Sequence, residues 1–230
     1  MWGLRWVEKS FRWRSDKGRA SIRLVGYLAR LMILRVLFLL GWTGCFAWAQ
    51  APAEELFELS GDSVPGIVIE MRYATEKNIT GKKIYPDGRA WLRMETIRKL
   101  KKVVMDLRER GYRLVLWDAW RPISAQKALW AAKPDGKFLT PPTKISRHNR
   151  GTSVDVSLAD LQGKLMEMPS DHDEFSAKAD ENFSDVPKEV GERAKILRQA
   201  MFRAGFSGVP DEWWHYDLRD WTSYDPIQGQ

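Results

Sequence analysis

One short segment combines a turn with two residue types that bind metals: Ser146-Arg147-His148-Asn149-Arg150-Gly151-Thr152-Ser153-Val154-Asp155. Gly151 marks the turn, because glycine tolerates backbone conformations that other residues avoid. From Val154 onward apolar and polar residues alternate, so Asp155 lies on the opposite face of a strand from its two valine neighbours. If His148 ends the loop and Asp155 begins the strand, both side chains can face one metal ion.

On both sides of this segment, helices and strands follow one another without regular alternation. Helices are predicted where apolar residues recur at helical spacing, and the two longest patterns stop at a glycine, the residue expected after a helix end. The expected elements are strands at residues 67–71, 112–117 and 154–158, helices at 92–110, 124–132 and 187–204, and a loop rich in proline and glycine at 133–144. This order predicts an α+β fold with a small, mostly antiparallel sheet flanked by helices.

A second cluster is Glu212-Trp213-Trp214-His215, which contains one of only three histidines in the chain. A spacing of three puts Glu212 and His215 on one side of a helical or turn segment, but on opposite faces of a flat strand. A proline and an aspartate just before the cluster favour a turn or irregular entry. We then expect the two tryptophans to line the site and to lower its water content.

The two clusters together match the requirements of a catalytic zinc site. Such a site needs three protein ligands from His, Asp, Glu or Cys, an open position for water, and a nearby carboxylate that takes the proton of the water. His148, Asp155 and His215 supply the ligands for one Zn²⁺ per chain, and Glu212 supplies the base. The sequence therefore predicts metal-assisted hydrolysis.

Arg121 follows a predicted buried strand at a turn just before Pro122. An arginine at such a place is either a surface cap or an anchor that holds a developing oxyanion or a substrate carboxylate through paired hydrogen bonds. The spacing of the residues leaves both interpretations open.

The positive charge of the chain is concentrated near its N-terminus. The net charge is +7, and residues 1–49 hold nine Lys or Arg against two acidic residues, whereas residues 50–230 hold 28 residues of each sign. A neutral body gives no electrostatic attraction for a polyanion. We therefore expect no nucleic-acid partner.

Residues 1–49 are interpreted as an N-terminal extension and signal sequence, followed by one catalytic domain over residues 50–230. Residues 36–49 are uncharged, follow Arg35 and end in a small-x-small pattern, which is typical of a secretory signal. The stretch is shorter than the roughly 20 residues that span a bilayer, so a permanent membrane helix is the less favoured alternative. We predict an exported, periplasmic protein.

Two further features of this region remain open. Met32 offers an alternative start of translation, because the basic stretch before it is longer than the start of a signal normally is. Cys45, the only cysteine of the chain, follows Thr43-Gly44 in a weak likeness to a lipoprotein acylation site. We expect contact with a membrane only through the signal sequence or through a lipid anchor at Cys45.

These motifs resemble the D-alanyl-D-alanine dipeptidases, the VanX-type zinc enzymes related to D,D-carboxypeptidases and to the hedgehog signalling fold. The resemblance covers roughly residues 68–218. It consists of Tyr73-Ala74-Thr75 with Asn78-x-Thr80-Gly81, the turn Trp117-Asp118-x-x-Arg121-Pro122, Ser-x-His-x-x-Gly-x-x-x-Asp at 146–155, Met168-Pro169-Ser170-x-x-Asp173, and Glu-Trp-Trp-His at 212–215. It implies a hedgehog/D,D-peptidase-like fold and a small D,D-dipeptide as the substrate, hydrolysed in cell-wall peptide turnover.

The same resemblance implies the roles of the central residues. The metal ligands would be His148, Asp155 and His215, which hold Zn²⁺. Glu212 would act as general base and later as general acid, and Arg121 would stabilise the tetrahedral transition state.

Four more residues are implied at the substrate. Asp173 would help to hold the amino terminus of the substrate, and Ser146 and Tyr73 would help to shape the small pocket. Arg147 is a further candidate for binding the substrate carboxylate, on the basis of its position alone.

The sequence departs from the family pattern at several positions, none of them a predicted ligand or the base. Ser153 replaces an alanine, Ala119-Trp120 replaces Gly-Tyr, Pro169 replaces a glycine, and His172 replaces an aromatic residue that is usually phenylalanine. The last two lie beside Asp173 and put a strict preference for dipeptides in doubt. We expect His172 to be a polar surface residue, with indirect support of the metal site as the alternative.

Three other functions remain open from the sequence. The first is a zinc D,D-carboxypeptidase that acts on longer peptidoglycan peptides. The second is a zinc-containing binding module without catalysis, against which Glu212 and Arg121 argue because a structural site needs neither. The third is a membrane-tethered structural protein, which leaves the clustered ligands unexplained.

Overall fold

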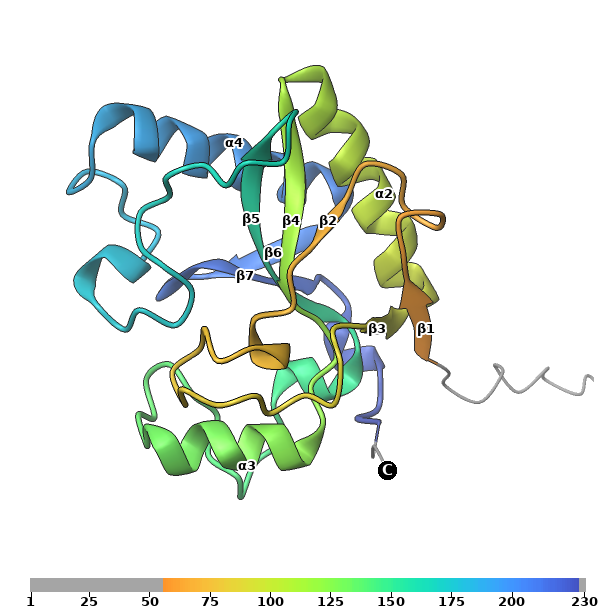
Figure 1. Ribbon diagram of the computed structural model, residues 1–230, viewed down its shortest axis with the longest axis vertical. Helices are drawn as coiled ribbons and strands as arrows, with labels where there is room; N and C mark the ends of the chain where they lie inside the picture. The colour runs from red at the N-terminus through yellow and green to blue at the C-terminus, as the bar shows by residue number, and fades with distance from the viewer. Residues whose placement is uncertain (1–55, 228–230) are drawn as a thin grey trace, which may run out of the picture. The chain divides into compact units, whose positions relative to one another are not determined.

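The computed structural model describes residues 56–227 (Figure 1). Several expectations fall on residues outside this range: the signal sequence at 36–49, the alternative start at Met32, the lipid anchor at Cys45 and the boundary at residues 49–50. They stay predictions. Among the described residues, none of the helices is both long enough and apolar enough to cross a membrane.

A five-stranded sheet forms the centre of the described chain, with the strand order β2-β4-β5-β7-β6. Only the edge pair β2 and β4 is parallel, and the other neighbours are antiparallel. A separate antiparallel pair joins β1 to β3. The strands are β1 (Leu56–Leu59), β2 (Val68–Ile69), β3 (Ala90–Arg93), β4 (Tyr112–Asp118), β5 (Ser153–Asp160), β6 (Phe206–Val209) and β7 (Glu212–Leu218). The expected small and mostly antiparallel sheet is confirmed.

Helices α2 (Met94–Glu109) and α4 (Lys188–Ala204) pack against each other and against the sheet, α2 on β4 and α4 on β5, β6 and β7. Helix α3 (Ile123–Ala132) lies at the other end of the sheet from α4 (Figure 1). Four short 3₁₀ turns complete the elements: η1 (Arg72–Ala74), η2 (Arg147–Arg150), η3 (Ala177–Ala179) and η4 (Trp221–Ser223). The α+β class is therefore confirmed.

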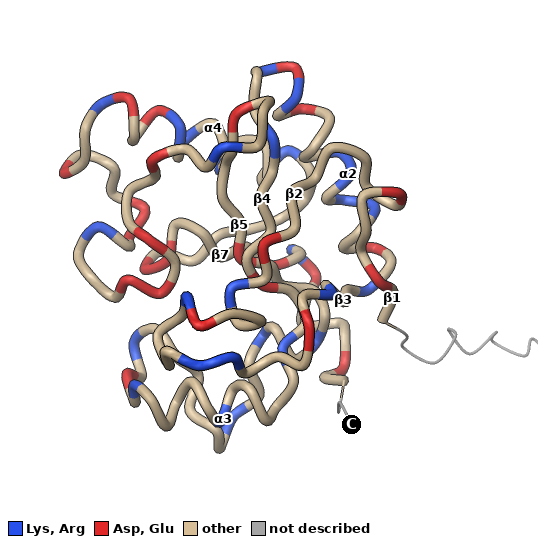
Figure 2. Tube along the Cα trace, viewed as in Figure 1, with Lys and Arg blue, Asp and Glu red and all other residues tan. Residues whose placement is uncertain are grey.

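The helix boundaries follow from local sequence patterns. The expected apolar stripe of α4 is buried, because all four of its members face the core: Val190, Ala194, Leu197 and Met201. Gly205 ends this helix with a φ of 101°, a left-handed conformation that glycine adopts without steric cost. The surface charges of α2 and α4 are interspersed in sign along both helices (Figure 2).

The strand predictions were less complete than the helix predictions. The structure shortens the expected strand at 67–71 to Val68–Ile69, and it adds β1, β3 and β6, whose short segments lack a clear alternation. The irregular entry that the sequence favours is present as a turn at residues 210–211 and a shifted pairing with β6, but residues 212–215 themselves are neither helix nor turn, because they begin β7. Hydrogen bonding to β5 and β6 on either side decides this, and the local sequence does not contain that information.

Gly151 is the turn residue between His148 and the strand, as the sequence predicts. Its φ is 71°, and a Cβ atom added there would lie 2.6 Å from Leu56 Cδ2 and 3.4 Å from the backbone nitrogen of Arg93. Its carbonyl oxygen accepts hydrogen bonds from the Arg93 backbone N–H at 3.0 Å and from Thr96 Oγ1 at 3.0 Å. The position therefore requires glycine both for its φ and for the close approach of neighbouring strands.

We predict that Gly151→Ala destabilises the fold more than Gly111→Ala does. Both positions have a positive φ, at 71° and 83°, but a Cβ at Gly111 would meet nothing within 4 Å. The shared conformational cost is about 1–2 kcal/mol, and the crowding at Gly151 adds about 1 kcal/mol or more. Urea unfolding midpoints of the two variants measure the difference. Equal losses would show that the crowding costs nothing.

Candidate active site

Three polar residues form a row across neighbouring strands and are the foundation of the site. In the sheet register, Asp118 of β4 lies opposite Asp155 of β5, and Asp155 lies opposite His215 of β7. Directly opposed residues in antiparallel strands have Cβ atoms about 4.5–5.5 Å apart. All three side chains are buried. The sheet therefore holds two of the predicted metal ligands in contact, with a second carboxylate beside them.

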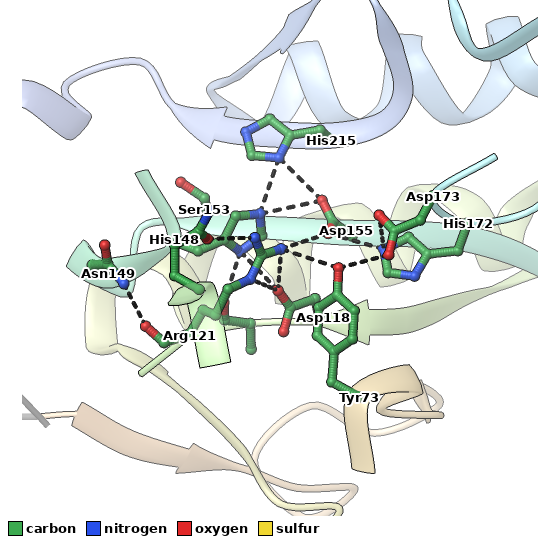
Figure 3. A network of polar contacts seen from close by, with 12 residues as sticks. Tyr73, Asp118, Arg121, His148, Asn149, Ser153, Asp155, His172, Asp173 and His215 are labelled. Atoms are coloured by element: carbon green, nitrogen blue, oxygen red, sulfur yellow. Dashed lines mark hydrogen bonds and ion pairs between the residues drawn. The ribbon is translucent and has the colours of Figure 1, made fainter. Parts of the chain in front are cut away.

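His148 joins this row from the turn η2. A capping box fixes the turn: the Ser146 backbone N–H donates to Asn149 Oδ1 at 2.8 Å, and the Ser146 side chain accepts from the backbone of the same turn. The His148 ring lies 4.8 Å from the His215 ring, centroid to centroid. His148 Nδ1 lies 2.8 Å from the carbonyl oxygen of Ala119, so the other ring nitrogen points at the row (Figure 3).

The ligand atoms of His148, Asp155 and His215 all lie within 4.8 Å of one another. His148 Nε2 is 3.0 Å from His215 Nδ1, and Asp155 Oδ1 is 3.0 Å from His215 Nδ1 and 3.3 Å from His148 Nε2. If each neutral ring donates through its other nitrogen, three electron-pair acceptors converge with no proton between them. A bound cation resolves that repulsion, so the donor set fits a metal such as zinc.

Asp217 supports His215 from behind. Its Oδ1 lies 3.0 Å from His215 Nε2 and accepts a hydrogen bond from Ser153 Oγ at 2.6 Å, while its Oδ2 accepts from Arg147 Nη1 at 2.7 Å. Burial alone would raise the pKa of Asp217, but His215, Ser153 and Arg147 hold this pKa below its usual value. The carboxylate therefore orients the His215 ring, a common arrangement behind metal-binding histidines.

Arg147 forms an ion pair with Asp217, and its guanidinium also lies 5.0 Å from the centroid of the Trp221 ring. Its side chain is 43% exposed and lines the pocket over the metal ligands. The structure places Arg147 at the rim of the site, where it both pairs with a buried carboxylate and faces the solvent.

Arg121 is buried beside the metal ligands, so the surface-cap interpretation is wrong. Its Nε and Nη2 donate to Asp118 Oδ2 at 3.0 and 2.8 Å, and its Nη1 donates to Gln126 Oε1 at 2.8 Å. Nη2 also lies 3.6 Å from Asp155 Oδ2. The guanidinium therefore stands between two opposed carboxylates and lines the pocket.

Glu212 reaches the site because the pairing of β7 is irregular. Gly208 pairs with Tyr216 and the next residue of β6, Val209, pairs with Glu212, so β7 has extra residues between its two pairing positions. Such a bulge re-aims side chains. Glu212 Oε2 consequently lies 3.8 Å from His215 Nδ1, although residues three apart point to opposite faces of a regular strand.

The ionisation of Glu212 is shifted by its surroundings. Burial raises the pKa of Glu212 to about 8; His215 and Arg121 lower this pKa, whereas Asp155 and Asp173 raise it. A carboxyl group that titrates near neutrality is suited to taking and returning a proton. A cation bound by the three ligands would favour the ionised form.

Asp173 and Tyr73 lie on the other side of Arg121. The Tyr73 hydroxyl donates to Asp173 Oδ2 at 2.8 Å and lies 3.4 Å from Arg121 Nη2. Asp173 has a φ of 58°, the only positive φ of a non-glycine residue among those described. Backbone strain of this kind persists where the surrounding structure holds it, and it is frequent at functional sites.

A pocket of about 380 Å³ joins these groups. Its lining includes all of the predicted ligands, the base and the substrate-binding candidates except Tyr73, which contacts the pocket through Asp173. Trp214 lines the pocket, as expected. Trp213 does not: it is buried in the core and donates from Nε1 to Ser170 Oγ at 2.9 Å. The expectation that both tryptophans line the site is therefore correct for Trp214 alone.

His172 is not a surface residue, contrary to the preferred expectation. Its side chain is 2% exposed, and Nε2 lies 3.1 Å from Asp155 Oδ2 and 3.7 Å from Asp173 Oδ1. Burial lowers the pKa of His172, but the two carboxylates and Asp118 outweigh it and raise this pKa above its usual value.

Sequence reasoning gave no role to Asp118 or Asp217, although both are buried in the site. Asp118 belongs to the motif before Arg121, and it also accepts a hydrogen bond from Tyr85 at 2.6 Å and lies 3.3 Å from His148 Nδ1. Asp217 follows His215 by two residues. Had residues 212–218 been assigned as a strand, alternation would have placed Asp217 on the same face as His215.

Comparisons with known proteins match the part of the chain that contains these site residues. The pattern of a protein family described as D-ala-D-ala dipeptidase matches residues 54–228, a range that contains every site residue above. D-alanyl-D-alanine dipeptidase of Escherichia coli (strain K12) is 36% identical over 166 residues, 72% of this chain and 86% of that protein. The protein of the same name from Enterococcus faecalis is 29% identical over 193 residues, 73% of this chain and 93% of that protein. A solved structure described as VanYB in complex with D-Alanine-D-Alanine gives a TM-score of 0.41 at 15% identity and covers 76% of this chain and 83% of that one.

We predict that His215→Ala abolishes stable zinc binding, whereas Glu212→Ala retains one zinc per chain. His215 supplies one of the three converging ligand atoms, and Glu212 lies outside that set. Metal content after dialysis, measured by mass spectrometry, distinguishes the two variants. Loss of zinc from Glu212→Ala as complete as from His215→Ala would contradict the assignment of the ligands.

Proposed function

The chain belongs to the peptidase family described as D-ala-D-ala dipeptidase, and we propose that it hydrolyses D-alanyl-D-alanine to two D-alanines in a zinc-dependent reaction. One observation above all supports this: three metal-ligand atoms converge in a pocket that also holds a carboxylate and a guanidinium. A purely structural metal site would need neither of the last two groups. This argues against a non-catalytic binding module.

The proposed ligands are His148, Asp155 and His215, with one zinc per chain. Bound zinc would supply a Lewis acid that polarises the scissile carbonyl and lowers the pKa of an attacking water toward roughly 7. The chain itself contributes the orientation of its ligands. Ala119 and Asp217 accept from the outer nitrogens of the two histidines and so direct the inner nitrogens at the centre of the site.

Glu212 is the proposed general base. Its carboxylate lies at the pocket wall near His215, so it can take a proton from the attacking water and later return it to the leaving amino group. Arg121 is the proposed stabiliser of the oxyanion. Its guanidinium is held by Asp118 and Gln126 before substrate arrives, so little reorganisation is needed as charge develops.

The pocket offers a side chain of opposite charge for each charged end of a dipeptide. Asp173, oriented by the Tyr73 hydroxyl, is the proposed anchor for the ammonium group of the substrate. Ser146 and Arg147 line the pocket on the η2 side and are proposed to face the substrate carboxylate. The pocket volume of about 380 Å³ is near the lower end of the roughly 300–1,000 Å³ usual for small-molecule sites.

The alternative is a D,D-carboxypeptidase that acts on longer peptidoglycan peptides. The pocket extends along residues 136–141 of the loop after α3, which offers contacts beyond those that a dipeptide needs. Faster hydrolysis of a pentapeptide than of free D-alanyl-D-alanine would favour this alternative.

Export to the periplasm and a role in cell-wall turnover belong to the proposal. They are supported by the uncharged stretch at residues 36–49 and its cleavage pattern. Lipid attachment at Cys45 is the alternative mode of retention.

The first experiment is release of D-alanine from D-alanyl-D-alanine by the purified chain that starts at Gln50. We expect D-alanine release that a chelator abolishes and added Zn²⁺ restores, because none of the three ligand side chains can itself act as the Lewis acid that the reaction needs. Absence of release from folded, zinc-loaded protein would contradict the dipeptidase function. A pentapeptide tested in parallel separates the two D,D-peptidase activities.

We also predict that Glu212→Ala lowers kcat by about 10²- to 10⁴-fold, the usual contribution of a general base. Glu192→Ala on the exposed face of α4 serves as the control and should retain full activity. Steady-state kinetics of both variants at equal zinc content give the comparison. A fully active Glu212→Ala would show that another group takes the proton.

A further inference from the structure

The carboxylate of Asp155 faces two different sets of neighbours with its two oxygens. Oδ1 lies 3.0 Å from His215 Nδ1 and 3.3 Å from His148 Nε2, at the centre of the ligand set. Oδ2 points away from that centre and lies 3.1 Å from His172 Nε2 (Figure 3). The nearest cation to Oδ2 is Arg121, at 3.6 Å. His172 is therefore the closest polar neighbour of the oxygen that does not face the two histidine ligands.

The direction of this hydrogen bond follows from the chemistry of the pair. An ionised carboxylate only accepts, so His172 Nε2 must carry the hydrogen and donate to Asp155 Oδ2. The other ring nitrogen, Nδ1, is buried without a hydrogen-bond partner among the described residues. The contacts to Asp155 and, at 3.7 Å, to Asp173 are consequently the polar interactions that orient the ring.

Packing around His172 does not require a histidine. The ring lies among three aromatic side chains, with centroid distances of 5.4 Å to Tyr73, 5.4 Å to Trp117 and 5.9 Å to Trp214. A phenylalanine ring would fill the same space and would leave no buried nitrogen without a partner. What histidine adds at this position is one N–H group between two carboxylates.

We propose that His172 is a positioning residue that fixes the Asp155 carboxylate for metal binding and links it to Asp173, the proposed anchor of the substrate amine. With Oδ2 engaged by His172, only Oδ1 is free to face the ligand set, so Asp155 offers one donor atom and leaves room for water and substrate. The inference rests on the metal site of the proposed function.

The test compares His172→Phe, His172→Gln and His172→Asn in the chain that starts at Gln50. Phenylalanine keeps the ring and removes the donor. Glutamine offers an N–H at the distance of Nε2 from the backbone, whereas asparagine offers one only at the distance of Nδ1. Zinc dissociation constants are measured by competition with a chromogenic chelator, which does not depend on enzymatic activity.

We expect His172→Phe to raise the zinc dissociation constant about tenfold or more, as loss of a group that orients a metal ligand typically does. His172→Gln should recover most of the affinity, and His172→Asn should not. The metal-free His172→Phe protein should remain folded by circular dichroism because no packing is lost, although the two buried carboxylates lose an N–H partner and the melting temperature falls.

Three outcomes overturn the inference. Zinc affinity of His172→Phe equal to that of the wild type would show that the N–H does not position Asp155. Loss of the single bound zinc from His172→Phe, as complete as the loss expected for His215→Ala, would make His172 a ligand. Equal loss in the glutamine and phenylalanine variants would show that an N–H at the distance of Nε2 does not restore zinc binding. If the wild type binds no zinc, the proposed metal site fails, and that result is distinct from all three.

Discussion

Two buried carboxylates face each other across β4 and β5, and the rest of the site compensates for them. Like charges directly opposed in a sheet destabilise it, and burial in a low dielectric makes an unpaired charge more costly still. Arg121 supplies a positive charge to both Asp118 and Asp155. The remaining oxygen of Asp155 faces two histidine nitrogens, which carry no hydrogen if each neutral ring donates through its outer nitrogen to Ala119 or Asp217. A cation bound between Asp155 and the two histidines would balance the remaining negative charge, and this is where the three ligand atoms converge.

Strand pairing and hydrogen bonds from neighbouring segments hold the backbone of each metal ligand in place. Asp155 and His215 lie on adjacent central strands, so their separation is set by the sheet register. His148 lies on a 3₁₀ turn, which is braced from outside: Arg93 donates to the carbonyl oxygen of Arg150 at 2.6 Å, and the Ile227 backbone N–H donates to that of Asn149 at 2.8 Å. The end of the described chain thus holds in place the one ligand that the sheet does not fix.

Sequence patterns recovered the helices better than the strands. The ends of α2 and α4 are marked by glycines, whose positive φ is a local property of one residue. Strand β7 was missed because its assignment depends on neighbours from β5 and β6 that are distant in the sequence. For the same reason the sequence could not show how Glu212 and His215 come to share a side, since a bulge is defined by the pairing of two strands. The burial of His172 was likewise decided by aromatic rings from three other segments.

The sequence by itself determined the chemical inventory of this protein: two histidines, an aspartate, a glutamate and an arginine in motifs whose types and order match a zinc peptidase. It also determined the helices and the turn at Gly151, because those depend on short-range spacing and on backbone sterics. Only the tertiary structure decided which nitrogen of each histidine faces the site, that Arg121 is buried between two carboxylates, and that Asp118, Asp217 and His172 belong to the network. Those facts are relations between residues on different strands and loops, and burial, distance and hydrogen-bond direction exist only once the chain has folded.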